Sequence, residues 1–86
     1  MKEYDLIALR SFVAVIETGS FYNAAVQLET SSASISRRVS SLEQSLGVRL
    51  LNRTTRHLEL TTAGEQFYKD VKGILESLEQ AEERLN

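Results

Sequence analysis

The sequence contains no cysteine and no proline, and His57 is its only histidine. Without cysteine, the chain can form neither a disulfide bond nor a thiolate metal site, which suits a reducing cytoplasm. A single histidine also argues against a metal site and against a catalytic Ser–His–acid arrangement in so small a chain. We therefore expect a cytoplasmic protein that is not an enzyme and holds no cofactor in this chain.

Long apolar runs are missing as well. No segment approaches the ~20 consecutive apolar residues that cross a bilayer, and residues 1–5 are not followed by the apolar stretch of a signal peptide. We therefore expect no contact with a membrane. The 86 residues fit one small domain, which buries only ~60–65% of its unfolded surface, so dimerisation would add stability.

The net charge is only −2, but the charges are unevenly distributed. Residues 30–57 hold five arginines and one acid, Glu43, for a net charge of +4, whereas the rest holds five basic and eleven acidic residues, for a net charge of −6. The five arginines are Arg37, Arg38, Arg49, Arg53 and Arg56. The planar guanidinium suits phosphates and guanine edges, so this block favours contact with nucleic acid. The alternative is a solvated surface strip in which Arg49 or Arg53 pairs with Glu43 or Glu59.

Two helices are predicted near the N-terminus by apolar residues at helical spacing. The first runs from about Asp5 to Thr18, with Asp5 as a suitable cap and Gly19 suited to end it in a left-handed conformation. Its apolar residues are Leu6, Leu9, Phe12, Val13 and Ile16. The second helix is short and follows another cap at Ser20, with an apolar stripe of Phe21, Ala24, Ala25 and Leu28. The hydroxyl residues from Thr30 to Ser32 then favour a turn.

A third helix, predicted from about Ser32 to Ser45, has two different faces. Its buried stripe consists of Ile35, Val39, Leu42 and Leu46, which share one side of a helix. The opposite face, called the outer face below, carries Ala33, Arg37, Ser40, Ser41 and Gln44, with Ser36 at its edge. Near its N-terminus the outer face has only small side chains, so the backbone can come close to base edges.

Residues 50–60 change from helical to alternating spacing and are predicted to form two short strands around a turn. His57 is expected to be an exposed residue of that turn, with a pH-sensitive DNA contact as the alternative. Apolar residues then recur every four or three positions, at Phe67, Val71, Ile74, Leu78, Ala81 and Leu85. This repeat indicates a coiled-coil seam on a helix over 62–85, ~36 Å long. We expect the seam to form a homodimer; the alternative is that it folds back on its own domain.

This order of elements predicts a mainly α, winged helix-turn-helix fold: a three-helix core and a β-hairpin wing, followed by a long dimerisation or linker helix. Residues 1–61 would be the DNA-binding domain, with the helix-turn-helix at about 21–40 and the wing at about 50–60. Residues 62–86 would be the linker helix. The alternative is a winged-helix protein-interaction module that recruits a partner through the seam helix. RNA is disfavoured because its deep, narrow major groove excludes a helix.

Three groups of residues carry a family resemblance. They are Phe12-x-x-Val15-x-Glu17-x-Gly19-Ser20-Phe21-x-x-Ala24-Ala25-x-x-Leu28, then Ser31-x-x-x-Ile35-Ser36-Arg37-x-Val39-x-x-Leu42-Glu43-x-x-Leu46-Gly47-Val48-Arg49-Leu50-Leu51-x-Arg53, and Leu60-Thr61-x-Ala63-Gly64. Together they resemble the LysR-type transcriptional regulators over about residues 5–65. The resemblance implies a bacterial regulator with a winged helix-turn-helix, a linker helix and a C-terminal effector-binding domain. The resemblance further implies that this last domain, where a small-molecule effector would bind, is missing here.

The resemblance also implies contacts by position. Base contacts are implied for Ser32, Ala33 and Ser36, phosphate contacts for Ser20, Ser31, Ser34 and Arg37, and wing contacts for Arg53 and Thr54. Arg56, also in the predicted wing, can reach the DNA backbone or a narrow minor groove. Many members have Gln or Pro at position 32 and Pro or Ser at position 33, so the preferred bases stay open. The expected partners are a pseudo-palindromic duplex and a second copy of the chain, with RNA polymerase as a further candidate.

Overall fold

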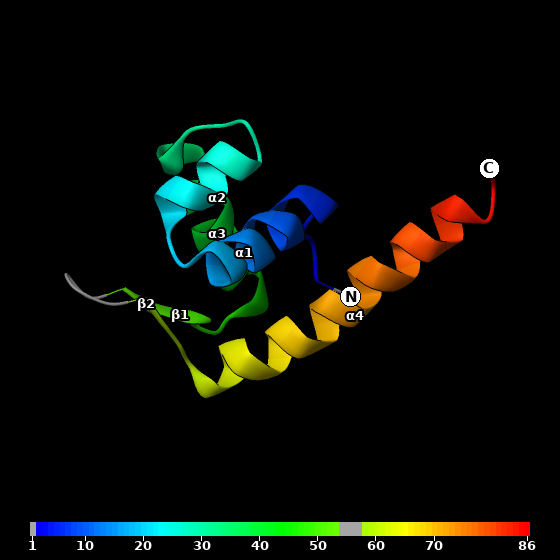
Figure 1. The fold of residues 1–86 in the computed structure, drawn as a ribbon. Coiled ribbons are helices and arrows are strands. Elements are labelled where there is room, and N and C mark those ends of the chain that lie inside the picture. The colour runs from blue at the N-terminus through cyan, green and yellow to red at the C-terminus, as the bar shows by residue number, and fades with distance from the viewer. Residues whose placement is uncertain (1, 54–57) are drawn as a thin grey trace.

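The computed structural model describes residues 2–53 and 58–86. The elements in chain order are α1 (Leu6–Thr18), α2 (Phe21–Gln27), α3 (Ser32–Leu46), β1 (Leu51–Arg53), β2 (Leu58–Leu60) and α4 (Thr62–Glu83). Figure 1 shows α1, α2 and α3 gathered into one body, with the hairpin on one side and α4 running past the body and beyond it. The predicted order of helices and strands is confirmed.

Side chains and glycines end the helices where the sequence predicts. The carboxylate of Asp5 accepts a hydrogen bond from the Ala8 amide (2.9 Å), and the Ser20 hydroxyl accepts one from the Asn23 amide (2.9 Å). Gly19 ends α1 at a φ of 84°, in the left-handed region where an L side chain would be strained. These contacts fix the length of α1 and the start of α2.

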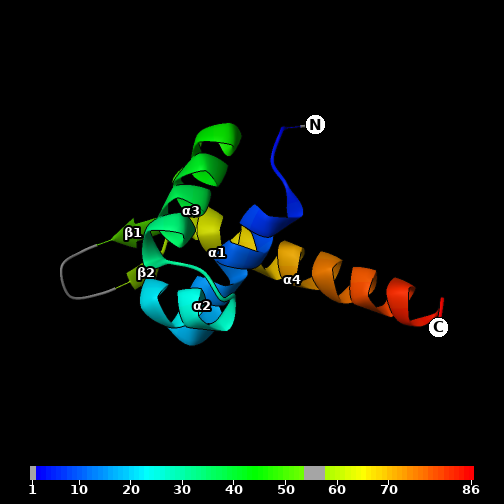
Figure 2. The ribbon, with the colours of Figure 1, turned by 90° about the horizontal axis from the view of Figure 1, so that it is seen from above.

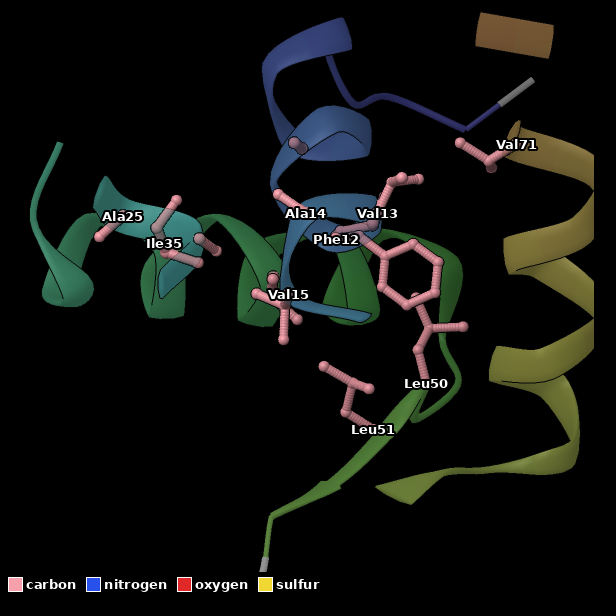
Figure 3. Packing of buried hydrophobic residues seen from close by; sticks show 13 residues of the cluster. Phe12, Val13, Ala14, Val15, Ala25, Ile35, Leu50, Leu51 and Val71 are labelled. Atoms are coloured by element: carbon pink, nitrogen blue, oxygen red, sulfur yellow. The ribbon is translucent and has the colours of Figure 1, made fainter. Parts of the chain in front are cut away.

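α1 is buried more completely than a single apolar stripe would be, because it packs against α2, α3 and α4. Phe12 and Val15 have no exposed surface, and Figure 3 shows the Phe12 ring pointing toward α4, above Leu50. Leu6, one of the apolar residues at helical spacing, is 37% exposed. Apolar residues occur all around this helix, so their spacing alone did not show where the buried arc is centred.

α3 buries the stripe that the sequence predicts. Ile35, Val39 and Leu42 are fully buried, and Leu46 packs partly buried against the same core. The next segment of the chain adds Leu50 and Leu51, each 1% exposed, to this core. Burial of this stripe fixes the rotation of α3 about its axis, so the outer face points away from the body.

The hairpin pairs β1 and β2 antiparallel, with Leu51 opposite Leu60, Asn52 opposite Glu59, and Arg53 opposite Leu58. The two predicted strands are confirmed. The turn between them, residues 54–57, lies outside the described residues. We call residues 50–60 the wing.

α4 begins at a cap on Thr61, whose hydroxyl accepts a hydrogen bond from the Gly64 amide (2.9 Å). Thr62 is already the first helical residue, so Thr62 and Glu65 do not form a capping box. Thr61 also donates its hydroxyl proton to the carbonyl of Arg49 (2.6 Å) and its amide to that of Leu50 (3.0 Å). The start of α4 is therefore fastened to the start of the wing.

The apolar seam of α4 is divided between the monomer core and its surface. Val71 is 1% exposed, and the Phe67 ring lies 5.8 Å from that of Phe12, centroid to centroid. Beyond them Ile74 is 58% exposed and Leu78 is 38% exposed. The prediction that all six seam residues await a second copy is thus corrected for Phe67 and Val71, because α1 packs against α4 and covers them.

Candidate nucleic-acid interface

The outer face of α3 is the most open polar surface that the sequence predicted. Ala33, Arg37, Ser40, Ser41 and Gln44 are all exposed, as is Ser32 in the first turn. Ser34 and Ser36 are half-buried at the edge of this face. Figure 2 shows the hairpin projecting from the body next to α3. The face is therefore flanked by the wing and has no bulky side chain over its first turn.

Ser31, Ser34 and Arg37 are linked by hydrogen bonds at the start of α3. The Ser31 hydroxyl caps the helix by accepting from the Ser34 amide (3.1 Å). The Ser34 hydroxyl oxygen accepts from the Ser31 hydroxyl (3.0 Å) and from Nη2 of Arg37 (3.2 Å). Within residues 2–53 and 58–86, the Ser34 hydroxyl proton and the other guanidinium donors of Arg37 have no acceptor, which suits an anionic oxygen at this helix end.

Arg53 at the end of β1 is held against the body. Its Nη1 donates to the Ser40 hydroxyl of α3 (3.2 Å), and its Nη2 lies 3.5 Å from Oε1 of Glu43. The guanidinium carbon also lies 5.0 Å from the ring centroid of Phe21 in α2, a cation–π distance. The ion pair that the sequence left open is therefore the one between Arg53 and Glu43.

Glu43 joins α3 to the wing as well as to Arg53. Its Oε2 accepts hydrogen bonds from the backbone amides of Leu50 (2.7 Å) and Leu51 (3.1 Å). Its side chain is only 11% exposed. The sequence identified Glu43 as the single acid in the arginine block. It did not identify Glu43 as an acceptor for backbone amides, because almost every residue carries a backbone amide and the residue types do not show which one is the donor.

The other predicted contact residues fall into two groups. Ser20 is half-buried, and its hydroxyl is engaged as the cap of α2. Thr54, Arg56 and His57 lie outside the described residues. Arg38, nearer the core, points a different way from Arg37, since its Nη1 donates to the buried Ser11 hydroxyl of α1 (3.4 Å).

A second polar cluster ties α1 to α4 and was not predicted from the sequence. The Glu17 carboxylate accepts hydrogen bonds from the Tyr68 hydroxyl (2.9 Å) and from the Lys72 ammonium. The Lys72 hydrogen bond holds the pKa of Glu17 below its usual value, while the bond to Glu17 raises the pKa of both Tyr68 and Lys72. These residues lie 51 and 55 positions apart, so only the packing of α4 brings them together.

Two other kinds of feature are absent from residues 2–53 and 58–86. No three His, Asp or Glu side chains there gather closely enough to hold a metal ion. In the same residues no helix combines the length and the apolar character that a bilayer crossing requires. The outer face of α3 and the wing beside it stay the strongest candidate site.

A helix-turn-helix with an open second helix, followed by a two-stranded wing, defines the winged helix-turn-helix class. The model of one family, described as "Bacterial regulatory helix-turn-helix protein, lysR family", matches residues 6–65. The chain belongs to this family of transcriptional regulators. The resemblance stated from the motifs is thus confirmed.

Known proteins resemble both the sequence and the fold. The HTH-type transcriptional regulator CrgA of Neisseria meningitidis is 49% identical over 74 residues, which are 86% of this chain and 25% of that protein. The BenM_DBD/catB site 1 DNA complex contains a chain of the same fold, with a TM-score of 0.90 and 36% identity over 94% of this chain and 91% of that one. For the CbnR_DBD–DNA complex the TM-score is 0.87 and the identity 40%, over 93% and 92%. This chain spans about a quarter of the length of CrgA and of the transcriptional activator AaeR of Escherichia coli, and 57% of a relative from Azotobacter vinelandii.

Proposed function

We propose that this chain is the DNA-binding part of a bacterial LysR-type transcriptional regulator, that it reads duplex DNA by sequence, and that it catalyses no reaction. The observation that carries the proposal is the outer face of α3. Its exposed residues are small or hydrogen-bonding, and Arg37 stands at its centre. Two domains of the same fold were solved as DNA complexes, which supports α3 as the helix that enters the major groove.

The contacts divide by their expected chemistry. Ser32, Ala33 and Ser36 would face base edges, where hydroxyls bond polar atoms and the alanine methyl can touch a thymine methyl. Ser20, Ser31, Ser34 and Arg37 would bind phosphates, and the wing, with Arg53, Thr54 and Arg56, would lie on flanking DNA. Since chromosomal DNA is the ligand, the protein acts in the bacterial cytoplasm.

The second half of α4 is proposed to hold two copies together. Ile74 and Leu78 expose large apolar side chains, and Ala81 lies on the same seam. Leu85 is exposed as well, but it lies beyond the end of α4 at Glu83, two residues short of the predicted helix end. In this arrangement residues 1–61 form the DNA-binding domain, residues 62–86 form the linker helix, and the two linker helices pair antiparallel. A two-fold dimer places one α3 on each half of a pseudo-palindromic site. RNA polymerase, and an effector bound by a further domain, are proposed partners of the longer regulator.

Selection of bound sequences from random duplex DNA tests this function. We expect a two-fold symmetric consensus, and much weaker binding to RNA of the same sequence, because an A-form major groove does not admit α3. Recovery of no consensus, together with equal binding to duplex DNA and RNA, would overturn the proposal. In that case a protein-interaction module that uses the α4 seam becomes the better interpretation.

A further inference from the structure

We propose that Glu43 is a positioning residue that holds the wing at a fixed place beside α3, and that this contact sets how strongly the protein prefers its own site over other DNA. The inference rests on the proposed function and deepens it. Glu43 itself need not touch DNA, since it acts through Arg53 and through the backbone of β1.

The first step is that one carboxylate joins two elements. Oε2 of Glu43, on α3, receives the amides of Leu50 and Leu51 at 2.7 and 3.1 Å, where the chain enters the wing. Two hydrogen bonds from adjacent amides to a charged, nearly buried acceptor are stronger than neutral ones and fix the direction of the backbone. The two bonds hold the base of the wing against α3, but they do not reach Arg53 at the far end of β1.

The second step is that the same carboxylate holds the other end of β1. Oε1 lies 3.5 Å from Nη2 of Arg53, whose side chain is 29% exposed. The guanidinium also donates to Ser40 and lies over the Phe21 ring, so contacts from α2, α3 and β1 meet at this one group. The planar fork of arginine suits such a junction, because its donors point in fixed directions.

The third step concerns charge. Glu43 is the only acid among residues 30–57, and it lies directly against an arginine of the proposed DNA-binding surface. A negative charge there weakens attraction to any DNA, since non-specific binding depends on phosphate neutralisation. Loss of that charge should therefore increase binding to all DNA while it loosens the wing. Specificity should fall because phosphate contacts made from a mobile wing no longer align α3 with the bases.

The experiment compares Glu43→Gln with Glu59→Gln as a matched control. The amide oxygen of glutamine can still accept from Leu50 and Leu51, but the charge that holds Arg53 is gone. Glu59 lies on β2 opposite Asn52 and is exposed, so its replacement removes the same charge from the wing without a described contact to Arg53. Binding is measured by anisotropy on the selected duplex and on a scrambled duplex, at several salt concentrations.

We expect both variants to bind the scrambled duplex more tightly. Glu59→Gln should increase the affinity for the selected duplex by a similar factor, so the ratio of the affinities for the selected and scrambled duplexes stays unchanged. Glu43→Gln should lower that ratio by about tenfold, in the range of one lost base-reading contact. Arg53→Lys, which keeps the charge but loses the planar fork, should lower the ratio too. Because its charge is retained, the salt dependence should stay nearly unchanged.

An unchanged affinity ratio in both Glu43→Gln and Arg53→Lys would overturn the inference. Circular dichroism and thermal unfolding establish whether Glu43→Gln is folded, and if it is not, Arg53→Lys alone decides. Failure of the wild-type protein to prefer any duplex would instead contradict the proposed function, so the two failures are distinguishable.

Discussion

The backbone carbonyl of Leu50 packs directly against Gly64 of α4, where a Cβ atom on residue 64 would lie 2.0 Å from the carbonyl oxygen. Thr61 bonds the same carbonyl through its amide (3.0 Å). The start of the wing and the first turn of α4 are thus in backbone contact. Any side chain at position 64 must push the two elements apart.

Gly64→Ala is therefore expected to destabilise the domain by about 1–3 kcal/mol or more, the cost of forcing extra atoms into a packed site. The matched control is Gly73→Ala. Gly73 is exposed in the same helix, and a Cβ atom added there would have no neighbour within 4 Å, so alanine should add about 0.5–1 kcal/mol of stability. Chemical denaturation measures both, and a neutral Gly64→Ala would contradict the close approach.

Leu42→Ala should be among the most damaging core substitutions. Leu42 has no exposed surface and belongs to the stripe that fixes the rotation of α3. Loss of its side chain should cost ~2–5 kcal/mol through lost burial and the cavity left behind. Chemical denaturation would measure the loss, and Gln44→Ala, on the exposed outer face, should stay within about 0.5 kcal/mol of wild type. If Leu42→Ala changes the free energy of unfolding as little as the control does, Leu42 is not buried and the assignment of the buried face of α3 is wrong.

The sequence predicted the fold well where an element buries one face and failed where it buries several. The predicted stripe of α3 is correct because the opposite face is polar. In α1 the spacing did not show which arc is buried, because apolar residues occur all around the helix. The site was predicted in part for the same reason. The outer face follows from helical spacing, but the contacts of Glu43 and Glu17 depend on backbone amides or on residues far along the chain. Spacing cannot reveal partners of that kind.

Leu78→Glu should prevent dimerisation through the second half of α4. Leu78 is 38% exposed and lies one turn beyond Ile74, so a charge there would be buried at the proposed interface. Gln80→Glu adds the same charge elsewhere on the helix and should leave the dimer intact. Sedimentation equilibrium over a range of concentrations measures both. A wild-type protein that stays monomeric at high micromolar concentration would show that the remaining seam residues do not suffice.

The cluster of Glu17, Tyr68 and Lys72 should make stability depend on pH at both extremes. The lowered pKa of Glu17 means that its contribution is present above its usual 4.5 and is lost as the pH falls through the lowered value. The pKa values of Lys72 and Tyr68 are raised above their usual 10.5 and 10.0, respectively. The stability that these two groups contribute is therefore present below those values and is lost as the pH rises through the raised pKa values. The cluster should therefore stabilise the fold most between these limits.

Lys72→Met should lower the thermal midpoint near neutral pH and lower it less in strong acid, where protonated Glu17 has already lost the ion pair. The effect should be small, because both side chains are substantially exposed and solvent screens them. Lys69→Met, an exposed neighbour on α4, is the control and should show no such pH dependence. If the thermal midpoints of wild type and Lys72→Met depend on pH in the same way, the Glu17–Lys72 ion pair does not contribute to stability as proposed.

Arg37→Ala should change how binding to the selected duplex depends on salt. Arg37 is exposed at the centre of the outer face, and in the part of the chain that the structure describes its guanidinium donates a hydrogen bond only to Ser34. If it neutralises one phosphate in each half of a dimer, its loss should flatten the slope of log affinity against log salt by ~2 units, at ~0.9 per contact. Arg53→Ala should flatten the slope by less, because Glu43 already compensates part of its charge. Arg10→Ala, which removes an exposed arginine of α1 on the side facing α4, should leave the slope nearly unchanged.

Ala33→Leu separates base reading from phosphate binding on the same face. Ala33 is exposed in the first turn of α3, where a larger side chain would meet base edges rather than the backbone of DNA. We expect a new selected consensus with a salt slope close to wild type, the reverse of the Arg37→Ala result. A salt titration of each variant on its own consensus duplex makes the comparison. If Arg37→Ala keeps the wild-type slope and Ala33→Leu keeps the wild-type consensus, the outer face of α3 is not the surface that binds DNA.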